Sequence, residues 1–178
     1  MPKAPQIVAV LLLFASVALA VTNSQQAAPQ PACAASEHRQ FDFWIGRWEV
    51  KRPDGRVAGT NVIRREHGGC VLIESWTGAG GMTGSSVNAY NPGTKRWHQT
   101  WADSSGTLLL IDGEWRNGAL RLAGEMFGPQ GRQQTRITWT PLSGGRLRQA
   151  WETSGDGGRT WRTAFDGLYE KLPIGAPQ

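Results

Sequence analysis

From Phe41 onward, polar and apolar residues alternate with a period of two, and turn-forming residues interrupt the alternation about every 8–12 residues. This feature restricts the fold most, because such alternation places one face of a strand inside and the other in water. Pairs such as Asp54-Gly55 and Asn117-Gly118 tolerate the positive φ of tight hairpin turns. No helical apolar spacing of useful length occurs here. We therefore expect strands at 43–52, 57–67, 70–78, 84–90, 96–103, 107–115, 119–126, 132–140, 146–153 and 160–170.

About ten short strands joined by short turns predict an all-β protein, with the strands in an antiparallel up-and-down β-barrel. Closing the sheet removes the two exposed edges at which strands of other molecules pair. A β-sandwich is the main alternative, but sandwiches usually need longer crossover connections than this sequence contains.

The first 20 residues have the pattern of a secretory signal peptide: Lys3, an apolar stretch, and the A-x-A end at Ala18-Leu19-Ala20. A membrane anchor is the alternative, but the apolar run is short for a spanning helix. We expect a flexible lead-in at 21–37, the barrel domain at 38–172 and a C-terminal tail at 173–178. The expected location is periplasmic or extracellular, with no membrane span.

Charge and cysteines limit the partners further. The formal net charge is +5, but the basic residues are scattered over several expected strands, which does not favour a nucleic-acid partner. Cys33 and Cys70 are the two cysteines, and in an oxidising compartment they can form a disulfide. Two unpaired thiols remain the alternative, because a sequence does not give the distance between them. No cysteine–histidine spacing indicates a zinc site.

Strand alternation also assigns side chains to the inside of the barrel. Arginine-rich faces belong in water, so the opposite faces, which carry tryptophan together with glutamine, are expected to point inward. By the same alternation, Glu74 shares a face with Leu72 and Trp76. A buried amide or carboxylate needs a partner, water or a ligand. Barrels of this strand number often enclose a cavity, although core packing is the alternative role for each of the nine tryptophans. The residues expected to bind a ligand are Glu74, Trp76, Trp97, Gln99, Trp101, Gln149 and Trp151.

Two further strands are assigned in the same way. Thr135, Ile137 and Trp139 are expected to share one face of their strand. Trp161, Thr163, Phe165 and Tyr169 are expected to share one face of the last strand.

Gly46-Arg47-Trp48, within FDFWIGRWEV, resembles the G-x-W signature of the calycin superfamily of lipocalins, fatty-acid-binding proteins and related barrels. The resemblance implies structural roles for Gly46 and Trp48, with the tryptophan packed across one end of the barrel. It also implies a basic side chain from near the end of the chain over that ring, for which Lys171 and Arg162 are the candidates.

The span from Phe41 to Tyr169 also resembles a bacterial family of exported, lipocalin-like domains of uncharacterised function. The motifs that carry this resemblance are FDFWIGRWEV, Gly-Gly-Cys and Glu-Ser-Trp at 68–76, WHQTWAD at 97–103, SGDGGRTW and FDGLY. It implies a fold rather than an activity.

Nitrobindin-like haem barrels share the ten-strand plan, and that resemblance implies a histidine ligand near the last strand. TAFDGLYEKL contains none, and the three histidines are His38, His67 and His98, the last on an expected outer face. We therefore expect no haem, other cofactor or metal.

SGDGGRTW, residues 154–161, matches the Asp-box pattern S-x-D-x-G-x-T-W of sialidase propeller blades. One such box does not make a propeller. We expect a structural turn in which Asp156 accepts hydrogen bonds from backbone amides and Trp161 packs under the hairpin.

Two function classes remain. The sequence contains no G-x-S-x-G, no H-E-x-x-H and no phosphate loop. It favours a non-catalytic protein that binds a small, partly apolar or aromatic ligand. The alternative is a small hydrolase or isomerase with Glu74 as acid or base, since burial among tryptophans raises a carboxyl pKa. A packed structural barrel without a cavity is the third possibility.

Overall fold

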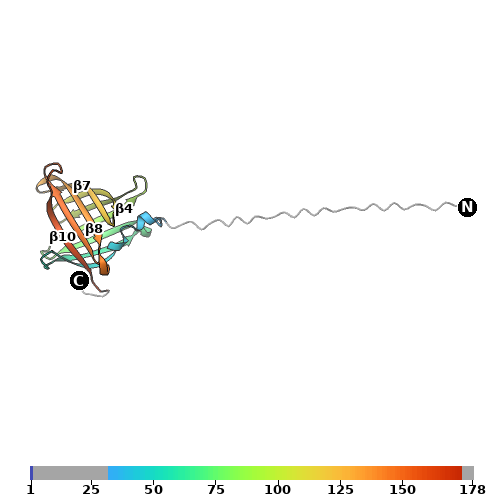
Figure 1. Ribbon diagram of the computed structural model, residues 1–178, viewed down its shortest axis with the longest axis horizontal. Coiled ribbons are helices and arrows are strands. Elements are labelled where there is room, and N and C mark those ends of the chain that lie inside the picture. The colour runs from blue at the N-terminus through green and yellow to red at the C-terminus, as the bar shows by residue number, and fades with distance from the viewer. Residues whose placement is uncertain (2–31, 174–178) are drawn as a thin grey trace.

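The ten expected strands are present, and they close into one antiparallel barrel (Figure 1). In this computed structural model, Met1 and residues 32–173 are described; the rest of the expected signal peptide and lead-in, and residues 174–178 of the expected tail, lie outside this part. Each strand pairs with the next along the chain, and β1 pairs with β10. The prediction of an all-β up-and-down barrel is confirmed, and closure excludes the sandwich. The strands are β1 (Gly46–Lys51), β2 (Val57–Glu66), β3 (Val71–Gly78), β4 (Thr83–Asn91), β5 (Arg96–Asp103), β6 (Leu108–Arg116), β7 (Ala119–Gly128), β8 (Gly131–Pro141), β9 (Leu147–Ser154) and β10 (Arg162–Lys171).

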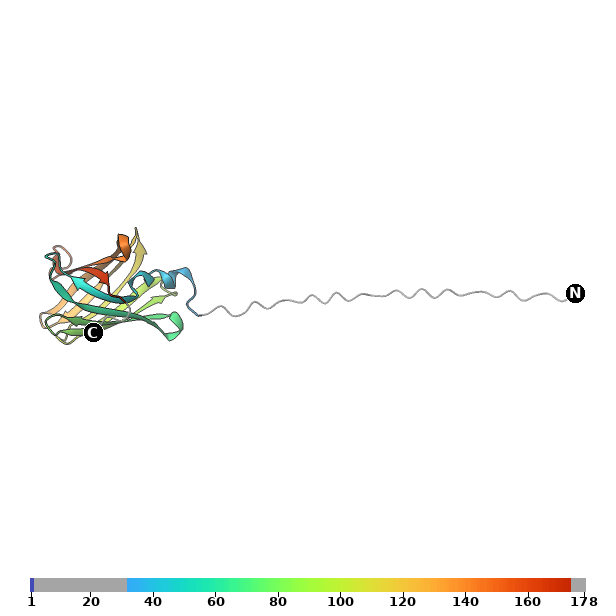
Figure 2. The same cartoon turned by 90° about the horizontal axis from the view of Figure 1, so that it is seen from below.

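The first expected strand begins later than the alternation indicated. Residues Asp42–Trp44 form the short 3-10 helix η2, and the strand starts at Gly46. Gly46 has φ of 142°, in the region that favours glycine, and this allows the chain to turn from η2 into β1. Two neighbouring 3-10 helices, η1 (Ser36–Arg39) and η3 (His67–Gly69), lie near the same end of the barrel, and η4 (Ser143–Gly145) connects β8 to β9. Figure 2 shows the N-terminal segment, in blue, at one end of the barrel.

That end of the barrel is closed by an aromatic plug, which consists of Phe41, Trp44, Trp48, Trp97 and Trp139. Each of these side chains is at most 2% exposed. Phe41 stacks on Trp44 with ring centroids 4.6 Å apart and meets Trp139 edge-on at 5.2 Å. Because rings of this size fill space efficiently, the plug forms the main apolar core.

Trp48 connects the plug to Lys171 at the end of β10. Its Nε1 donates a hydrogen bond to the backbone oxygen of Trp44 at 2.8 Å. Lys171 places its Nζ 5.2 Å from the ring centroid of Trp48. Of the two basic residues expected near this ring, Lys171 is therefore the one in contact.

A disulfide joins Cys33 to Cys70, with Cα atoms 5.1 Å apart. Arg39 supports this connection, since its Nη2 donates hydrogen bonds to the backbone oxygens of Cys33 and Gly69, at 2.5 and 2.8 Å. The segment before the barrel is thus fastened to the turn between β2 and β3. Residues 32–37, expected to belong to a flexible lead-in, include the start of η1.

The expected alternation of the last strand is wrong at its start. Thr163 pairs with Glu152, but Phe165 pairs with Trp151, so a β-bulge places one additional residue between them. A single additional residue reverses the faces of all residues before it. Phe165 and Tyr169 consequently face inward, whereas Thr163 is exposed. Trp161 also lies outside, with the guanidinium of Arg136 4.1 Å from its ring centroid.

Within residues 32–173, no helix is both long enough and apolar enough to cross a membrane.

Candidate functional site

The barrel encloses a cavity of about 80 Å³ at the end opposite the aromatic plug. The alternation of β5 shows this arrangement, because Trp97 belongs to the plug, whereas Trp101, on the same face of the strand, lines the cavity. The side chains around the cavity come from β3, β5, β6, β8, β9 and β10 and from the β3–β4 turn. They are Glu74, Trp76, Met82, Gln99, Trp101, Leu109, Ile137, Gln149, Trp151, Phe165 and Tyr169.

All residues expected to bind a ligand lie in this lining except Trp97. Trp97 does face inward, as expected, but it meets Phe41 edge-on at 5.6 Å, and its Nε1 donates to Gln40 Oε1 at 3.3 Å. It is 2% exposed and belongs to the plug. The structure thus separates Trp97 from the other candidates by position along the barrel, which strand alternation does not give.

The lining has two layers. The mouth, formed by Trp76, Met82, Trp101, Trp151 and Phe165, is apolar. Trp76 is buried, whereas the other four are at least partly exposed, and Met82 is 40% exposed. The polar floor consists of Glu74, Gln99, Gln149 and Tyr169, of which Glu74, Gln99 and Tyr169 are at most 4% exposed. A molecule that enters the cavity therefore meets aromatic rings first and polar atoms at the bottom.

Glu74 is the centre of the polar floor. Its Oε1 accepts a hydrogen bond from Asn61 Nδ2 at 2.7 Å, and its Oε2 accepts one from Ser86 Oγ at 2.5 Å. Asn61 is on β2 and Ser86 on β4, so both strands beside β3 support the carboxyl group. A carboxylate oxygen can accept two hydrogen bonds, and each oxygen of Glu74 accepts one here, which leaves room for a further donor on each.

The hydrogen bonds around Ser86 fix the direction of its own proton. Ser86 Oγ accepts from Asn88 Nδ2 at 2.8 Å and from Gln99 Nε2 at 3.2 Å. Two amide donors occupy both lone pairs of the hydroxyl, so its single proton points to Glu74. Gln99 Nε2 also donates to Asn88 Oδ1 at 2.8 Å. These amides therefore hold Glu74 as an acceptor, the role of an ionised carboxylate.

Tyr169, on β10, continues the network from Asn61 on β2 to Gln149 on β9. Its hydroxyl accepts a hydrogen bond from Asn61 Nδ2 at 3.3 Å and donates one to Gln149 Oε1. Burial is the main reason that the pKa of Tyr169 lies well above its usual value, and the charge of Glu74 adds to it. The phenol therefore stays protonated and can act only as a neutral donor and acceptor.

Burial raises the pKa of Glu74 from 4.5 to about 7, against the opposing effect of the hydrogen bonds from Ser86 and Asn61. Among the described residues, no ion pair involves Glu74. Arg65, on the same strand as Asn61, is bound to Asp42 instead. Glu74 is therefore a carboxyl group near half-ionisation at neutral pH, inside a cavity and without a cationic partner from residues 32–173.

Two of the three tryptophans of the mouth have their indole nitrogens bonded outside the cavity. Trp101 Nε1 donates to Asp103 at 3.2 Å, and Trp151 Nε1 donates to Thr135 Oγ1 at 2.7 Å. Trp101 also lies against Gly84, where a Cβ would come within 2.3 Å of the ring. These contacts hold the indoles in place, and what they offer to the cavity is aromatic carbon.

Several residues of the network were not identified from the sequence. Asn61, Ser86 and Asn88 are polar residues at inward positions, and each is at most 2% exposed. The period of two in TGSSVNAYN places Ser86 and Asn88 on the same face of their strand. Neither this strand nor that of Asn61 contains a tryptophan, and without one the sequence does not indicate which face points inward. Met82 lies in a turn, where alternation does not apply.

Residues 154–161, which match the Asp-box pattern, form the β9–β10 turn at the open end of the barrel. Asp156 Oδ1 accepts hydrogen bonds from the backbone nitrogens of Arg159 and Thr160, at 3.0 and 2.9 Å, and Oδ2 accepts one from the Thr160 hydroxyl at 2.6 Å. The hydrogen bonds from Thr160, followed by that from Ser154, lower the pKa of Asp156 to about 2. Trp161 closes the turn, because its Nε1 donates to the backbone oxygen of Gly158 at 3.0 Å.

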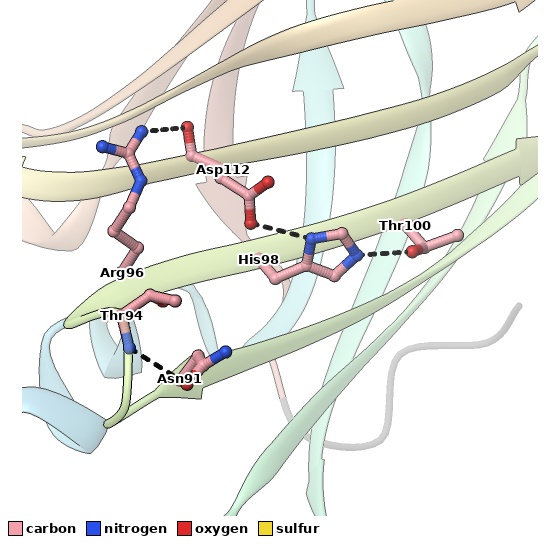
Figure 3. Close-up of polar contacts among 6 residues, drawn as sticks. All are labelled: Asn91, Thr94, Arg96, His98, Thr100 and Asp112. Carbon is pink, nitrogen blue, oxygen red and sulfur yellow. Dashed lines mark hydrogen bonds and ion pairs between the residues drawn. The ribbon is translucent and has the colours of Figure 1, made fainter.

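A second hydrogen-bonded chain lies on the outer face of β5 and β6 (Figure 3). His98 Nδ1 lies 2.9 Å from Asp112 Oδ1, and its Nε2 lies 2.7 Å from Thr100 Oγ1. The order of carboxylate, imidazole and hydroxyl is that of a catalytic triad. However, the side chains of His98 and Asp112 are 41% and 54% exposed, and none of the three residues lines the cavity. His98 faces outward, as the alternation of β5 predicted.

No group of three or more histidine, cysteine, aspartate or glutamate side chains within residues 32–173 is arranged to hold a metal ion. No protein-family model matches this chain, and no curated protein is significantly similar to it. The fold and the cavity together define a closed ten-stranded barrel with an aromatic mouth and a polar floor. The cavity, rather than similarity to a known protein, is therefore the feature that indicates a function.

Proposed function

We propose that this protein is an exported, non-catalytic, lipocalin-like barrel that binds a small, partly apolar or aromatic ligand in the cavity beside Glu74. The observation that carries this proposal is the layered lining: partly exposed rings at the mouth and buried, hydrogen-bonded polar groups at the floor. Binding sites for small molecules are mostly apolar, with a few polar groups that orient the ligand. A barrel that served only as a packed scaffold would gain nothing from Glu74 in this position, because a buried carboxyl group costs free energy.

Two further features support the lipocalin-like part of the proposal. The G-x-W motif lies where η2 enters β1, and Lys171 lies over Trp48, the arrangement that the calycin resemblance implies. The signal-like N-terminus supports export. The disulfide between Cys33 and Cys70 is compatible with an oxidising compartment.

Tryptophan fluorescence against a panel of metabolites and lipids tests the proposal. A ligand in the cavity changes the emission of Trp76, Trp101 and Trp151. The variants Trp101→Ala and Gln99→Ala, in the mouth and the floor, are expected to bind more weakly. Trp161→Phe is the matched control, because Trp161 lies outside the barrel under Arg136. If no compound changes the wild-type emission, or if the cavity variants bind as well as the control, the proposal fails.

A second candidate function is proton transfer by Glu74 in a small hydrolase or isomerase. The observation that favours it is the pKa of about 7, since a group near its pKa both accepts and releases protons at neutral pH. The measurement is an NMR titration of Glu74 with its carboxyl carbon labelled. A midpoint in the ordinary glutamate range would exclude this candidate and leave the binding function untouched.

A further inference from the structure

The chemical class of the ligand follows from the lack of a positively charged partner for Glu74 among residues 32–173. The directed hydrogen bonds from Asn61 and Ser86 make Glu74 an acceptor, and the two amides behind Ser86 prevent that hydroxyl from reversing its role. The polar network is therefore built for a carboxylate. A buried carboxylate is stable only with a positive partner or with enough donors to replace its hydration.

The protein itself supplies no positive partner within residues 32–173. The side chains facing Glu74 are Asn61 from β2, Ser86 from β4 and Tyr169 from β10; Gln99 and Gln149 complete the floor. Tyr169 is the one titratable group among them, and it is a neutral phenol. Each oxygen of Glu74 accepts one hydrogen bond in the described residues, so both retain a lone pair for a donor that arrives from the cavity.

The wall above Glu74 suits a cation as well. Trp76, Trp101 and Trp151 line the cavity together with Phe165, and Phe165 meets Trp76 edge-on at 5.9 Å. Since the indole nitrogens of Trp101 and Trp151 are bonded elsewhere, a ligand meets their aromatic carbon. The face of an aromatic ring carries negative potential and attracts ammonium groups. A cavity of about 80 Å³ accommodates a small head group better than a bulky quaternary one.

We propose that the cavity binds a small primary amine, whose ammonium group pairs with Glu74 while its hydrocarbon part lies against the rings of the mouth. This inference rests on the proposed function and names the ligand class for the same cavity. The ammonium group supplies three donors and one positive charge, and the carboxylate supplies two oxygens with free lone pairs.

The test compares 2-phenylethylamine with 2-phenylethanol, which has a similar size but no charge, by calorimetric titration of the full chain. We expect the amine to bind more tightly than the alcohol at pH 8, where Glu74 is ionised and an alkylamine keeps its proton. Between pH 6 and pH 8 the affinity for the amine is expected to rise about tenfold, because only the ionised form of Glu74 binds it. The affinity for the alcohol is expected to show no such rise.

Variants sharpen the same test. Glu74→Gln removes the charge at constant size and is expected to weaken amine binding more than about tenfold while retaining alcohol binding. Glu114→Gln is the matched control, because it removes an exposed carboxylate on β6 and leaves the cavity unchanged. If Glu74→Gln does not fold, the comparison of amine and alcohol and its pH dependence on the wild type decide the question.

Each outcome separates this inference from the proposed function. Equal, pH-independent binding of amine and alcohol overturns the amine inference and leaves a binding protein. The amine inference is overturned in the same way if neither compound binds but another member of the fluorescence panel does. If no compound of either set binds, both the inference and the proposed function fail.

Discussion

The two ends of the barrel are built from the same kind of residue and differ in what covers them. On β5, Trp97 and Trp101 share one face of the strand, yet the first is 2% exposed in the plug and the second is half-buried in the mouth. The 3-10 helix η2 places Phe41 and Trp44 on the closed end. In the part of the chain that the structure describes, no residue of a 3-10 helix lines the mouth. An inward tryptophan therefore belongs to the core or to the cavity wall, depending on which segment covers it.

The polar atoms of the rings do not divide in the same way. In the plug, the buried Nε1 atoms of Trp44 and Trp139 have no hydrogen-bond partner, whereas those of Trp48 and Trp97 are bonded. In the mouth, the Nε1 atoms of Trp101 and Trp151 are bonded. An unpaired buried donor costs about 1–3 kcal/mol, so close packing outweighs polar pairing at Trp44 and Trp139. At the open end, hydrogen bonds fix the ring orientations of Trp101 and Trp151.

The largest expected effect comes from truncating the plug. Trp139→Ala removes a fully buried ring from contact with Phe41 and Trp44, and we expect the free energy of unfolding to fall by about 3–5 kcal/mol. Trp101→Ala, at the mouth, is expected to cost about 1 kcal/mol, because its ring is partly in solvent. Urea unfolding of both variants measures the difference.

Trp139→Phe serves as the control for the plug. It keeps a ring in place and removes the unpaired Nε1, so its loss of stability should be clearly smaller than that of Trp139→Ala. Similar losses for Trp139→Ala and Trp101→Ala would show that the two ends do not differ in packing.

The disulfide is the next way to test the closed end. It joins residues 37 positions apart and fastens the segment before η1 to the β2–β3 turn. The double variant Cys33→Ser/Cys70→Ser is expected to lose about 2–4 kcal/mol of stability, because the unfolded chain regains its freedom. Thermal unfolding measures this loss, and ligand titration of the folded variant should give unchanged affinity. Reduced affinity would mean that the closed end controls the open one.

The pH dependence of stability tests the buried acid Glu74 at the open end. The pKa of Glu74 is about 7 in the folded protein and 4.5 without burial, so the folded state binds more protons between these values. Stability contributed by protonated Glu74 is full below pH 4.5 and is lost as the pH rises through 7. We expect a loss of about 3 kcal/mol relative to Glu74→Gln.

Urea unfolding of the wild type and Glu74→Gln at pH 4 and pH 8 measures this difference. The contributions of the other titrating groups are the same in both proteins and cancel in the comparison. Parallel pH profiles of the two proteins would contradict a buried, unpaired carboxyl group.

The barrel and most of the cavity lining were predictable because both depend on strand alternation, a local property. Gln99 and Gln149 lie on faces that arginines opposite them mark as inner faces, and Glu74 shares its face with Leu72 and Trp76. Two features were not predictable. The bulge that turns Thr163 outward arises from pairing with β9, and the assignment of Trp97 to the plug depends on where η2 packs. Both are long-range contacts, which alternation along one strand does not contain.

Residues 154–161 show the reverse situation. Their side-chain hydrogen bonds all lie within the segment, so the short motif alone predicts the turn in which Asp156 accepts from backbone amides. The expectation for Trp161 was only half correct: the ring packs at the hairpin, but on the outer face. Local bonds determine the turn, and pairing between strands determines which face the ring takes.

The smallest expected effect lies outside both ends, in the chain of Asp112, His98 and Thr100. Asp112→Asn removes the carboxylate beside His98, and because both side chains are exposed to water, the free energy of unfolding should change by less than about 1 kcal/mol. Ligand affinity in the cavity should not change, since Asp112 points away from it. Urea unfolding and fluorescence titration measure the two quantities. A change in affinity comparable to that of Glu74→Gln would show that a charge on the outer face of the barrel influences ligand binding in the cavity. The difference between plug and mouth would then not be enough to explain binding.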